Sequence, residues 1–237
     1  MAKENEALGE AVDRKRGCKR VLLVDDHPLV RDGLAALIRA TPDLAVAGEV
    51  GCAEETLERL AVDTPDLILL DLGLPGTNGI ELLKELRSTF PRVRVLVLSM
   101  HEESVYAERV LRAGAKGYIM KHEPGEKIIE AIRCVLQGEL YVSAVIAARM
   151  LKLFVGSKQG VDSRASIEHL SDRELQVYTL IGGGMSSQEV ATHLKLSAKT
   201  IQTYREHIKR KLGLRNATDL VHNATHWAQS ENGQPHP

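Results

Sequence analysis

The stretch Leu67–Gly79 limits what this chain can fold into more than any other part of its sequence. It begins with an unbroken apolar run that is too short for a helix and is typical of a strand buried on both faces of a parallel sheet. The run ends on the carboxylate of Asp71 and passes into glycine, proline and asparagine, which favour turns. Open α/β sheets bind their ligands at the carboxyl ends of the strands. Asp71 is therefore the first candidate for chemistry.

Similar apolar runs alternate with helical patterns through the first half of the chain. The strands are predicted at residues 20–26, 44–50, 66–71, 93–99 and 117–120. One helix starts at His27-Pro28, with Leu29, Leu34, Leu37 and Ile38 on its apolar face, and the others cover 53–62, 80–88, 104–113 and 124–137. Strands that alternate with helices predict a five-stranded, doubly wound parallel sheet with helices on both faces.

Right-handed crossovers bring the ends of four of these strands to one edge of the sheet. Three carboxylates, Asp25, Asp26 and Asp71, then crowd together, and their repulsion favours a hard divalent cation. Mg²⁺ needs few protein ligands, so one or two of these carboxylates and a backbone carbonyl, with Gly73 as the candidate, suffice.

The same edge carries the residues for phosphoryl transfer. A carboxylate can attack phosphorus and form an acyl phosphate, which gives Asp71 the role of nucleophile. Lys121 and the metal would neutralise the charge on the phosphoryl group, and Ser99 could donate a hydrogen bond to it. We name this edge, with Asp25, Asp26, Asp71, Ser99 and Lys121, the acidic rim.

From Gly138 the sequence changes character. An apolar helix is predicted over 141–154 and a flexible linker over 156–166, and residues 167–229 show helical periodicity without a strand. Ser171 and Glu174 form a capping box that opens one helix. The next two helices, 187–194 and one capped by Ser197 and running to Leu212, are joined by a tight turn with the spacing of a helix-turn-helix.

The second of these helices has an apolar inner face of Ile201, Ile208 and Leu212. Its other faces carry amides and hydroxyls, which suit base edges, and cations, which suit phosphates. A last helix, capped by Asn216, covers 219–228. Its residues Leu220, Val221 and Ala224 fit a dimer face and core burial equally well.

Residues 19–137 resemble the receiver domain of bacterial two-component response regulators. The acidic pair, the strand-end Asp, the hydroxyl and the Lys follow one another in that order and spacing. The resemblance implies a flavodoxin-like fold, Mg²⁺ binding by Asp25 and Asp26, and phosphorylation of Asp71. It also implies that Ser99 is the switch hydroxyl, Tyr118 the switch aromatic and Lys121 the phosphate partner, although core packing alone also explains Tyr118.

Residues 170–216, from Leu170-Ser171-Asp172-Arg173-Glu174 to Lys211-Leu212-Gly213-Leu214-Arg215-Asn216, resemble the LuxR-type helix-turn-helix domain, and the whole chain resembles the NarL/FixJ regulators. Carried across position by position, the resemblance implies a DNA contact set of Lys199, Thr200, Gln202, Thr203, Glu206 and Lys209. Glu206 could accept from a cytosine or pair with Lys209 or Arg210 on the same helix.

Together with composition, the resemblance predicts domains at 19–137 and 167–229, a linker with a helix at 138–166, and disordered ends at 1–18 and 230–237. It implies a phosphorylation-controlled, DNA-binding transcription regulator rather than an enzyme. The expected partners are a sensor histidine kinase, the half-sites of double-stranded DNA, a second copy of the chain when phosphorylated, and RNA polymerase as a further candidate.

Two alternatives stay open. One is a phosphorylation-independent DNA-binding or interaction protein whose receiver is locked. The other is a phosphatase of the haloacid dehalogenase type, which resembles this chain in its strand-end Asp and Mg²⁺ but places an acid where Gly73 stands. Three scattered cysteines, a charged N-terminus and the lack of an 18-residue apolar run predict a cytoplasmic protein without a membrane segment.

Overall fold

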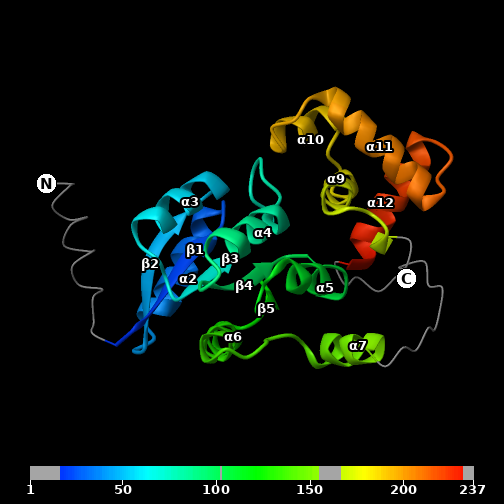
Figure 1. Ribbon diagram of the computed structural model, residues 1–237. Coiled ribbons are helices and arrows are strands. Elements are labelled where there is room, and N and C mark those ends of the chain that lie inside the picture. Colours follow the sequence, from blue (N-terminus) through cyan, green and yellow to red (C-terminus); the bar gives the residue numbers. More distant parts are fainter. Residues whose placement is uncertain (1–16, 102, 155–166, 232–237) are drawn as a thin grey trace, which may run out of the picture. The chain divides into compact units, whose positions relative to one another are not determined.

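The computed structural model describes residues 17–101, 103–154 and 167–231 (Figure 1). The chain separates into two compact units: the first comprises residues up to 74 and 79–148, and the second comprises 75–78 and the residues from 149 onward, so that one boundary falls inside α7. The segments predicted as a disordered leader (1–18) and tail (230–237) lie almost entirely outside the described ranges, as does the predicted linker 156–166. In the part of the chain that is described, no helix has both the length and the apolar composition needed to cross a membrane.

The first unit is built on a five-stranded sheet in which every pair of neighbouring strands is parallel. The order is β2-β1-β3-β4-β5, and the strands are β1 (Lys19–Val24), β2 (Leu44–Val50), β3 (Leu67–Leu70), β4 (Arg94–Ser99) and β5 (Gly117–Met120). The doubly wound parallel sheet predicted from the sequence is therefore confirmed. The bounds of β2 and β5 are those predicted, and β1 and β3 end before the acids that were counted with them.

Helices cover both faces of this sheet (Figure 1). On one face, α2 (Pro28–Arg39) and α6 (Gly125–Gln137) pack on alternate strand residues such as Leu23, Leu69 and Leu98. On the other face lie α3 (Ala53–Val62), α4 (Gly79–Thr89) and α5 (Glu103–Ala113). Burial on both faces explains why the central strands are continuously apolar rather than alternating.

The predicted apolar face of α2 is wrong at one residue. Leu34 and Ile38 are buried as expected, but Leu29 is 85% exposed. A helix turns about 100° per residue, so Leu34 and Ile38 stand about 140° and 180° around the axis from Leu29. Leu29 therefore cannot share their face.

Helix α7 (Ala144–Phe154) begins three residues later than the predicted helix 141–154, because Tyr141 extends the sheet instead. The Tyr141 N–H donates to the Lys116 carbonyl at 3.0 Å, and the Tyr118 N–H donates to the Tyr141 carbonyl at 2.8 Å. The backbone groups of Tyr141 are thus committed to β5 and are not free to begin a helix.

The second unit contains α9 (Asp172–Gly182), α10 (Ser187–His193), α11 (Ala198–Leu212) and α12 (Ala217–Glu231). The predicted caps are confirmed, since Ser171 and Glu174 bond reciprocally, Ser197 accepts from the Thr200 N–H, and Asn216 accepts from the Asp219 N–H. A second capping box, Ser186 with Glu189, starts α10 and was missed.

For two of its residues, burial decides whether the apolar side of the last helix is a dimer face or part of the core. Leu220 and Ala224 are fully buried and Trp227 is 8% exposed, so they belong to the core of the unit itself. Val221 is 41% exposed. At Gly182 a side chain is excluded by close packing of α9 on α12, because a Cβ there would lie 2.5 Å from the Ala224 carbonyl oxygen.

Candidate functional site

The register of the parallel strands brings the acidic rim together. Val24 of β1 pairs with Leu70 of β3, so Asp25 and Asp71 follow neighbouring strands at the same level. The Asp71 N–H donates to the Val24 carbonyl at 2.8 Å, which continues this ladder by one residue. Lys121 reaches the rim because its N–H donates to the Ser99 carbonyl at 2.8 Å, just beyond the paired ends of β4 and β5.

Lys121 lies between two of the three predicted carboxylates. Its Nζ is 2.6 Å from Asp25 Oδ2 and 2.8 Å from Asp71 Oδ2. The three side chains are only 8%, 3% and 6% exposed, in the order Lys121, Asp25, Asp71. One buried ammonium therefore holds two buried carboxylates.

The titration of this pair follows from one cation serving two acids. Burial raises the pKa of Asp71, the nearby Asp25 raises it further, and the Lys121 charge offsets only part of the rise. Burial alone would lower the pKa of Lys121, but the two carboxylates outweigh it and raise the pKa above its ordinary value. Lys121 is therefore firmly charged, and the rim retains an excess of negative charge.

The donor atoms of the rim suit a hard divalent cation. Asp25, Asp26, His27 and Asp71 each offer an atom within 4.8 Å of the others. Asp25 Oδ2 and Asp26 Oδ1 are buried oxygens whose nearest charged neighbours are Lys121 Nζ at 2.6 Å and His27 Nδ1 at 2.7 Å. Three clustered carboxylates with only one ammonium between them leave oxygens and negative charge available to a hard cation such as Mg²⁺.

Two neighbours complete the surroundings of the carboxylates. His27, which the sequence placed at the start of a helix, is the residue before α2, and its Nδ1 lies 2.7 Å from Asp26 Oδ1. The Gly73 N–H bonds to Asp71 and lowers its pKa. A Cβ at Gly73 would lie 3.2 Å from Asp71 Oδ2, so a side chain there would press on the carboxylate.

Ser99 and Tyr118 are both buried beside the rim. Ser99 Oγ accepts from the His101 N–H at 3.1 Å, and the Tyr118 hydroxyl donates to the His101 carbonyl at 2.5 Å. His101 also stacks on Tyr106, with ring centroids 4.7 Å apart. Burial, together with the charge of Lys121, lowers the pKa of His101 to about 4, so the ring is neutral near pH 7.

His101 links the two residues that the sequence singled out as switch positions, and sequence reasoning missed it. Its place two residues after Ser99 was the available signal. Both links use its backbone, which any residue type provides, so the residue type gave no clue.

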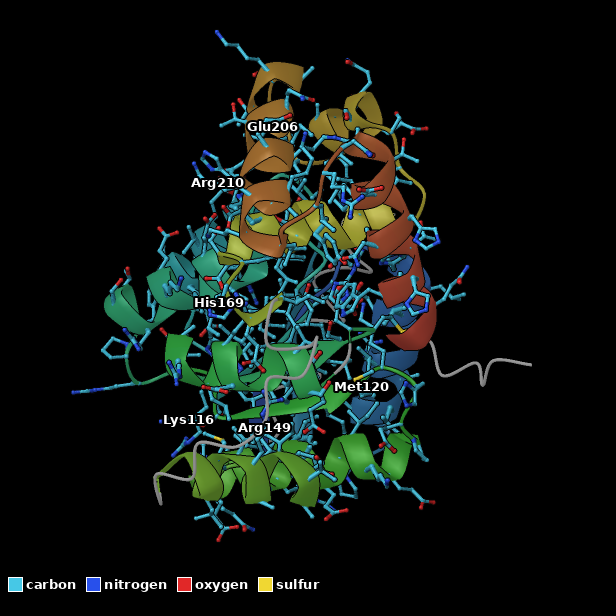
Figure 2. All side chains as sticks on the ribbon, turned by 90° about the vertical axis from the view of Figure 1, so that its right-hand side faces the viewer. Lys116, Met120, Arg149, His169, Glu206 and Arg210 are labelled. Carbon is cyan, nitrogen blue, oxygen red and sulfur yellow. The ribbon has the colours of Figure 1, made fainter. Side chains whose placement is uncertain are left out.

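The six predicted DNA contact residues all fall within α11, and Glu206 is labelled among them in Figure 2. Lys199, Gln202, Thr203 and Glu206 are exposed, whereas Thr200 and Lys209 are partly buried. Ile201 and Ile208 are fully buried, as the predicted inner face requires, whereas its third residue, Leu212, is only partly buried. Figure 2 shows Glu206 and Arg210 projecting from α11 away from the rest of the helical unit.

A buried carboxylate fixes α11 against α9. Glu174 Oε2 accepts from the Ser171 N–H at 2.7 Å and from Lys211 Nζ at 2.5 Å. His207 Nδ1 of α11 lies 3.7 Å from the other oxygen, Oε1. The sequence predicted the capping bond of Glu174 but not its link to α11, which depends on how the two helices pack.

Two families match the chain, one for each unit. Residues 21–133 match the family described as "Response regulator receiver domain". Residues 168–224 match the family described as "Bacterial regulatory proteins, luxR family".

Curated relatives match over most of the chain. The oxygen regulatory protein NreC of Staphylococcus epidermidis is 32% identical over 206 residues, which are 85% of this chain and 94% of NreC. NreC of Staphylococcus aureus is 33% identical over 205 residues, with the same coverage of 85% and 94%.

Solved structures agree. A LuxR-family two-component response regulator from Aurantimonas sp. SI85-9A1 is 36% identical, with a TM-score of 0.54 over 58% of this chain and 99% of that one. RcsB of Salmonella enterica serovar Typhimurium, bound to promoter rprA in the presence of the phosphomimetic BeF3-, has a TM-score of 0.63 at 24% identity. That match covers 88% of this chain and 98% of RcsB, and it supports the fold alone.

Proposed function

Because this chain belongs to the NarL/FixJ family of two-component response regulators, and is a phosphorylation-dependent DNA-binding regulator, we propose a role for each residue of its two sites. We assign the receiver to residues 19–137 and the DNA-binding domain to 167–229. The observation that supports the proposal best is the buried Lys121 between Asp25 and Asp71.

Asp71 is the phosphoacceptor. A carboxylate oxygen of Asp71 attacks the phosphorus of a phosphohistidine on a sensor histidine kinase, so the O–P bond forms as the N–P bond breaks. The imidazole of the kinase leaves with the electron pair of that bond. Lys121, already charged and in contact with Asp71, moves its hydrogen bond to an oxygen of the new phosphoryl group.

The metal ligands are Asp25, Asp26, Asp71 and the Gly73 carbonyl. The clustering of carboxylate oxygens from Asp25, Asp26 and Asp71 within 4.8 Å of one another supports a cation here. When bound, Mg²⁺ neutralises charge on the reacting oxygens. Since the rim carries three carboxylates and one ammonium, a divalent ion also relieves the repulsion that remains before phosphorylation.

Ser99 and Tyr118 pass the change on. The Ser99 hydroxyl moves inward to donate a hydrogen bond to the phosphoryl group. The Tyr118 side chain then moves into the space that Ser99 has left. Both residues contact the backbone of His101, so a shift of the 99–101 segment acts on both. Such a coupled segment is the kind of two-state element that a new charge can bias.

The output is DNA binding through α11. The contact set is Lys199, Thr200, Gln202, Thr203, Glu206 and Lys209, in which amides and hydroxyls face base edges and cations face phosphates. Two phosphorylated copies bind two half-sites about one helical turn apart. Double-stranded DNA and the histidine kinase place the protein in the cytoplasm, with RNA polymerase as a candidate partner at promoters.

The chain is not an enzyme in this proposal. A phosphatase with a strand-end Asp needs a nearby acid to protonate the leaving group and activate water. The position two residues after Asp71 is Gly73, which has no side chain for that role. The acyl phosphate is therefore held rather than turned over rapidly.

The experiment is phosphorylation of the full chain by acetyl phosphate with Mg²⁺, read as a base-labile adduct by intact mass. Asp71→Asn is expected to carry no adduct, and removal of Mg²⁺ with EDTA is expected to prevent labelling of the wild type. Asp66→Asn, which removes a surface partner of Lys19, is the matched control and labels normally. Equal labelling of Asp71→Asn would show that the phosphoacceptor is another residue.

A second measurement distinguishes this proposal from the alternative of a receiver locked in one state. Beryllofluoride with Mg²⁺ is expected to increase binding of the full chain to promoter DNA, and not that of Asp71→Asn. If binding is equally tight with and without beryllofluoride, output does not depend on the receiver and the alternative holds.

A further inference from the structure

The exposed side of α11 carries one acid among several cations. Glu206 is 53% exposed, with Lys209 and Arg210 about one turn away and Lys199 about two turns away on the same helix. A carboxylate facing DNA phosphates is unfavourable, since it opposes the attraction that brings the helix to DNA. Glu206 therefore needs a reason to be there.

Both oxygens of Glu206 are already used within the helix. Gln202 Nε2 donates to Glu206 Oε1 at 2.9 Å, and Lys209 Nζ lies 2.9 Å from Glu206 Oε2. The spacings are four and three residues, at which side chains on a helix meet. A carboxylate that reads a cytosine must turn an open oxygen to the base, and these two contacts compete with that.

The contact with Glu206 determines how Gln202 is oriented. A carboxylate oxygen only accepts, so the amide must turn its nitrogen, not its oxygen, toward Glu206. One N–H of Gln202 is used in this bond. When the bond to Glu206 uses the N–H anti to the carbonyl, the syn N–H and the carbonyl oxygen lie side by side for a ligand, and this donor–acceptor pair matches N7 and N6 of adenine.

We propose that Glu206 is a positioning residue for base recognition: it holds Gln202 in the orientation that reads adenine, and does not contact a base itself. This inference rests on the proposed role of α11 in DNA binding and revises the role of one member of the contact set. Lys209 completes the arrangement, because it is only 18% exposed and balances the charge of Glu206. The chemical class recognised is an A·T pair in the major groove.

The experiment uses the full chain, activated with beryllofluoride, and a duplex selected from a randomised double-stranded DNA library. Affinity is then measured for every single base-pair change in that duplex. Gln202→Ala is expected to lose about tenfold discrimination at one A·T pair, the size expected for a bidentate contact. Glu206→Ala is expected to lose discrimination at the same pair, and the double variant to lose no more than either alone.

Two conservative variants of Glu206 show whether its effect comes from holding Gln202 in place or from its negative charge. Glu206→Gln keeps the length and an acceptor for Gln202, so adenine discrimination is retained while the salt dependence of binding changes. Glu206→Asp keeps the charge but is too short to reach both Gln202 and Lys209, so discrimination falls as in Glu206→Ala. A merely electrostatic role would give the opposite order.

Other outcomes overturn the inference. Loss of discrimination at a C·G pair in the Glu206 variants, with Gln202→Ala unaffected there, makes Glu206 a cytosine reader. Independent losses that multiply in the double variant also overturn it. If Gln202→Ala, Thr203→Ala and Lys209→Ala all leave affinity for the selected duplex unchanged, the proposed use of α11 itself has failed.

Discussion

The acidic rim and the exposed side of α11 both gather charged groups, but they hold them in opposite ways. At the rim, Lys121, Asp25 and Asp71 are almost fully buried and are fixed by the ends of neighbouring strands. On α11, Gln202, Glu206 and Lys209 are held by one another on a solvent-facing helix. Burial makes the rim costly to alter, whereas the face of α11 can exchange partners when DNA arrives.

Breaking the buried cluster has the largest expected effect. Lys121→Met removes the cation that serves two buried carboxylates. Loss of one partner of a buried ion pair costs about 3 to 5 kcal/mol, because the remaining charge is uncompensated. Urea unfolding of the full chain without Mg²⁺ should show this loss in the transition of the receiver unit, and Mg²⁺ should restore more stability to the variant than to the wild type.

Lys127→Met is the matched control for this change. Lys127 pairs with Glu123 on the surface and is 54% exposed, so its removal should leave the unfolding midpoint unchanged. If the two variants behave alike, burial does not distinguish the rim from the surface and the comparison is wrong.

Among the described residues of the second unit, Glu174 is a buried carboxylate, and it bonds to Lys211 of α11. Glu174→Gln weakens the bonds from Lys211 and the Ser171 N–H, at an expected cost of about 2 kcal/mol at pH 7. The variant should also loosen α11 on α9. Urea unfolding followed by the fluorescence of Trp227, the one tryptophan in the sequence, reports on this unit.

The pH dependence of this effect has a definite sign. Burial raises the pKa of Glu174, but the bonds from Lys211 and Ser171 outweigh it and hold the pKa below its usual 4.5. A group whose pKa is lower in the folded than in the unfolded state stabilises the fold at any pH above its unfolded-state pKa. This contribution is lost as the pH falls through the folded-state pKa. The wild type should therefore approach the variant in stability as the pH drops below 4.5. A difference that is constant from pH 7 to 3 would assign the effect to packing.

The second unit also depends on close backbone packing between α9 and α12. Gly182→Ala places a Cβ 2.5 Å from the Ala224 carbonyl oxygen, so α9 and α12 must separate. Overpacking of this kind costs about 1 to 3 kcal/mol. Thermal unfolding measures it, and Gly183→Ala is the control because its Cβ would have no neighbour closer than 3.5 Å. Equal stability of the two variants would mean that α12 adjusts freely.

The meeting of the carboxylates with Lys121 at the rim could be predicted from the sequence, because strand ends and register follow from apolar periodicity. Asp25, Asp71 and Lys121 meet as expected once the strands pair. The errors occur where periodicity is a poor guide. Leu29 was placed on the wrong side of α2, and Tyr141 was counted in a helix although it pairs with β5.

The contacts on α11 could not be predicted to the same depth. The sequence allowed Glu206 to pair with Lys209 or with Arg210, and the structure pairs it with Lys209 and adds Gln202. Side chains three and four residues apart on a helix have several partners of similar energy. Which partner is chosen depends on the packing below the helix, and that packing is not encoded in local spacing.

The N-terminus of α11 tests how much of its exposed face depends on the backbone beneath. Ser197 Oγ accepts from the Thr200 N–H at 3.0 Å and lies 2.8 Å from the Thr200 hydroxyl, so the cap also occupies a predicted DNA contact. Ser197→Ala is expected to cost about 1 kcal/mol of stability, the smallest effect considered. Because the cap orients the first turn, which carries Lys199 and Thr200, affinity for a selected duplex should fall uniformly at all base positions. A loss confined to one base pair would instead assign the Thr200 hydroxyl to base recognition. The first turn of α11 would then, like the acidic rim, hold its side chains in one fixed arrangement for a specific contact.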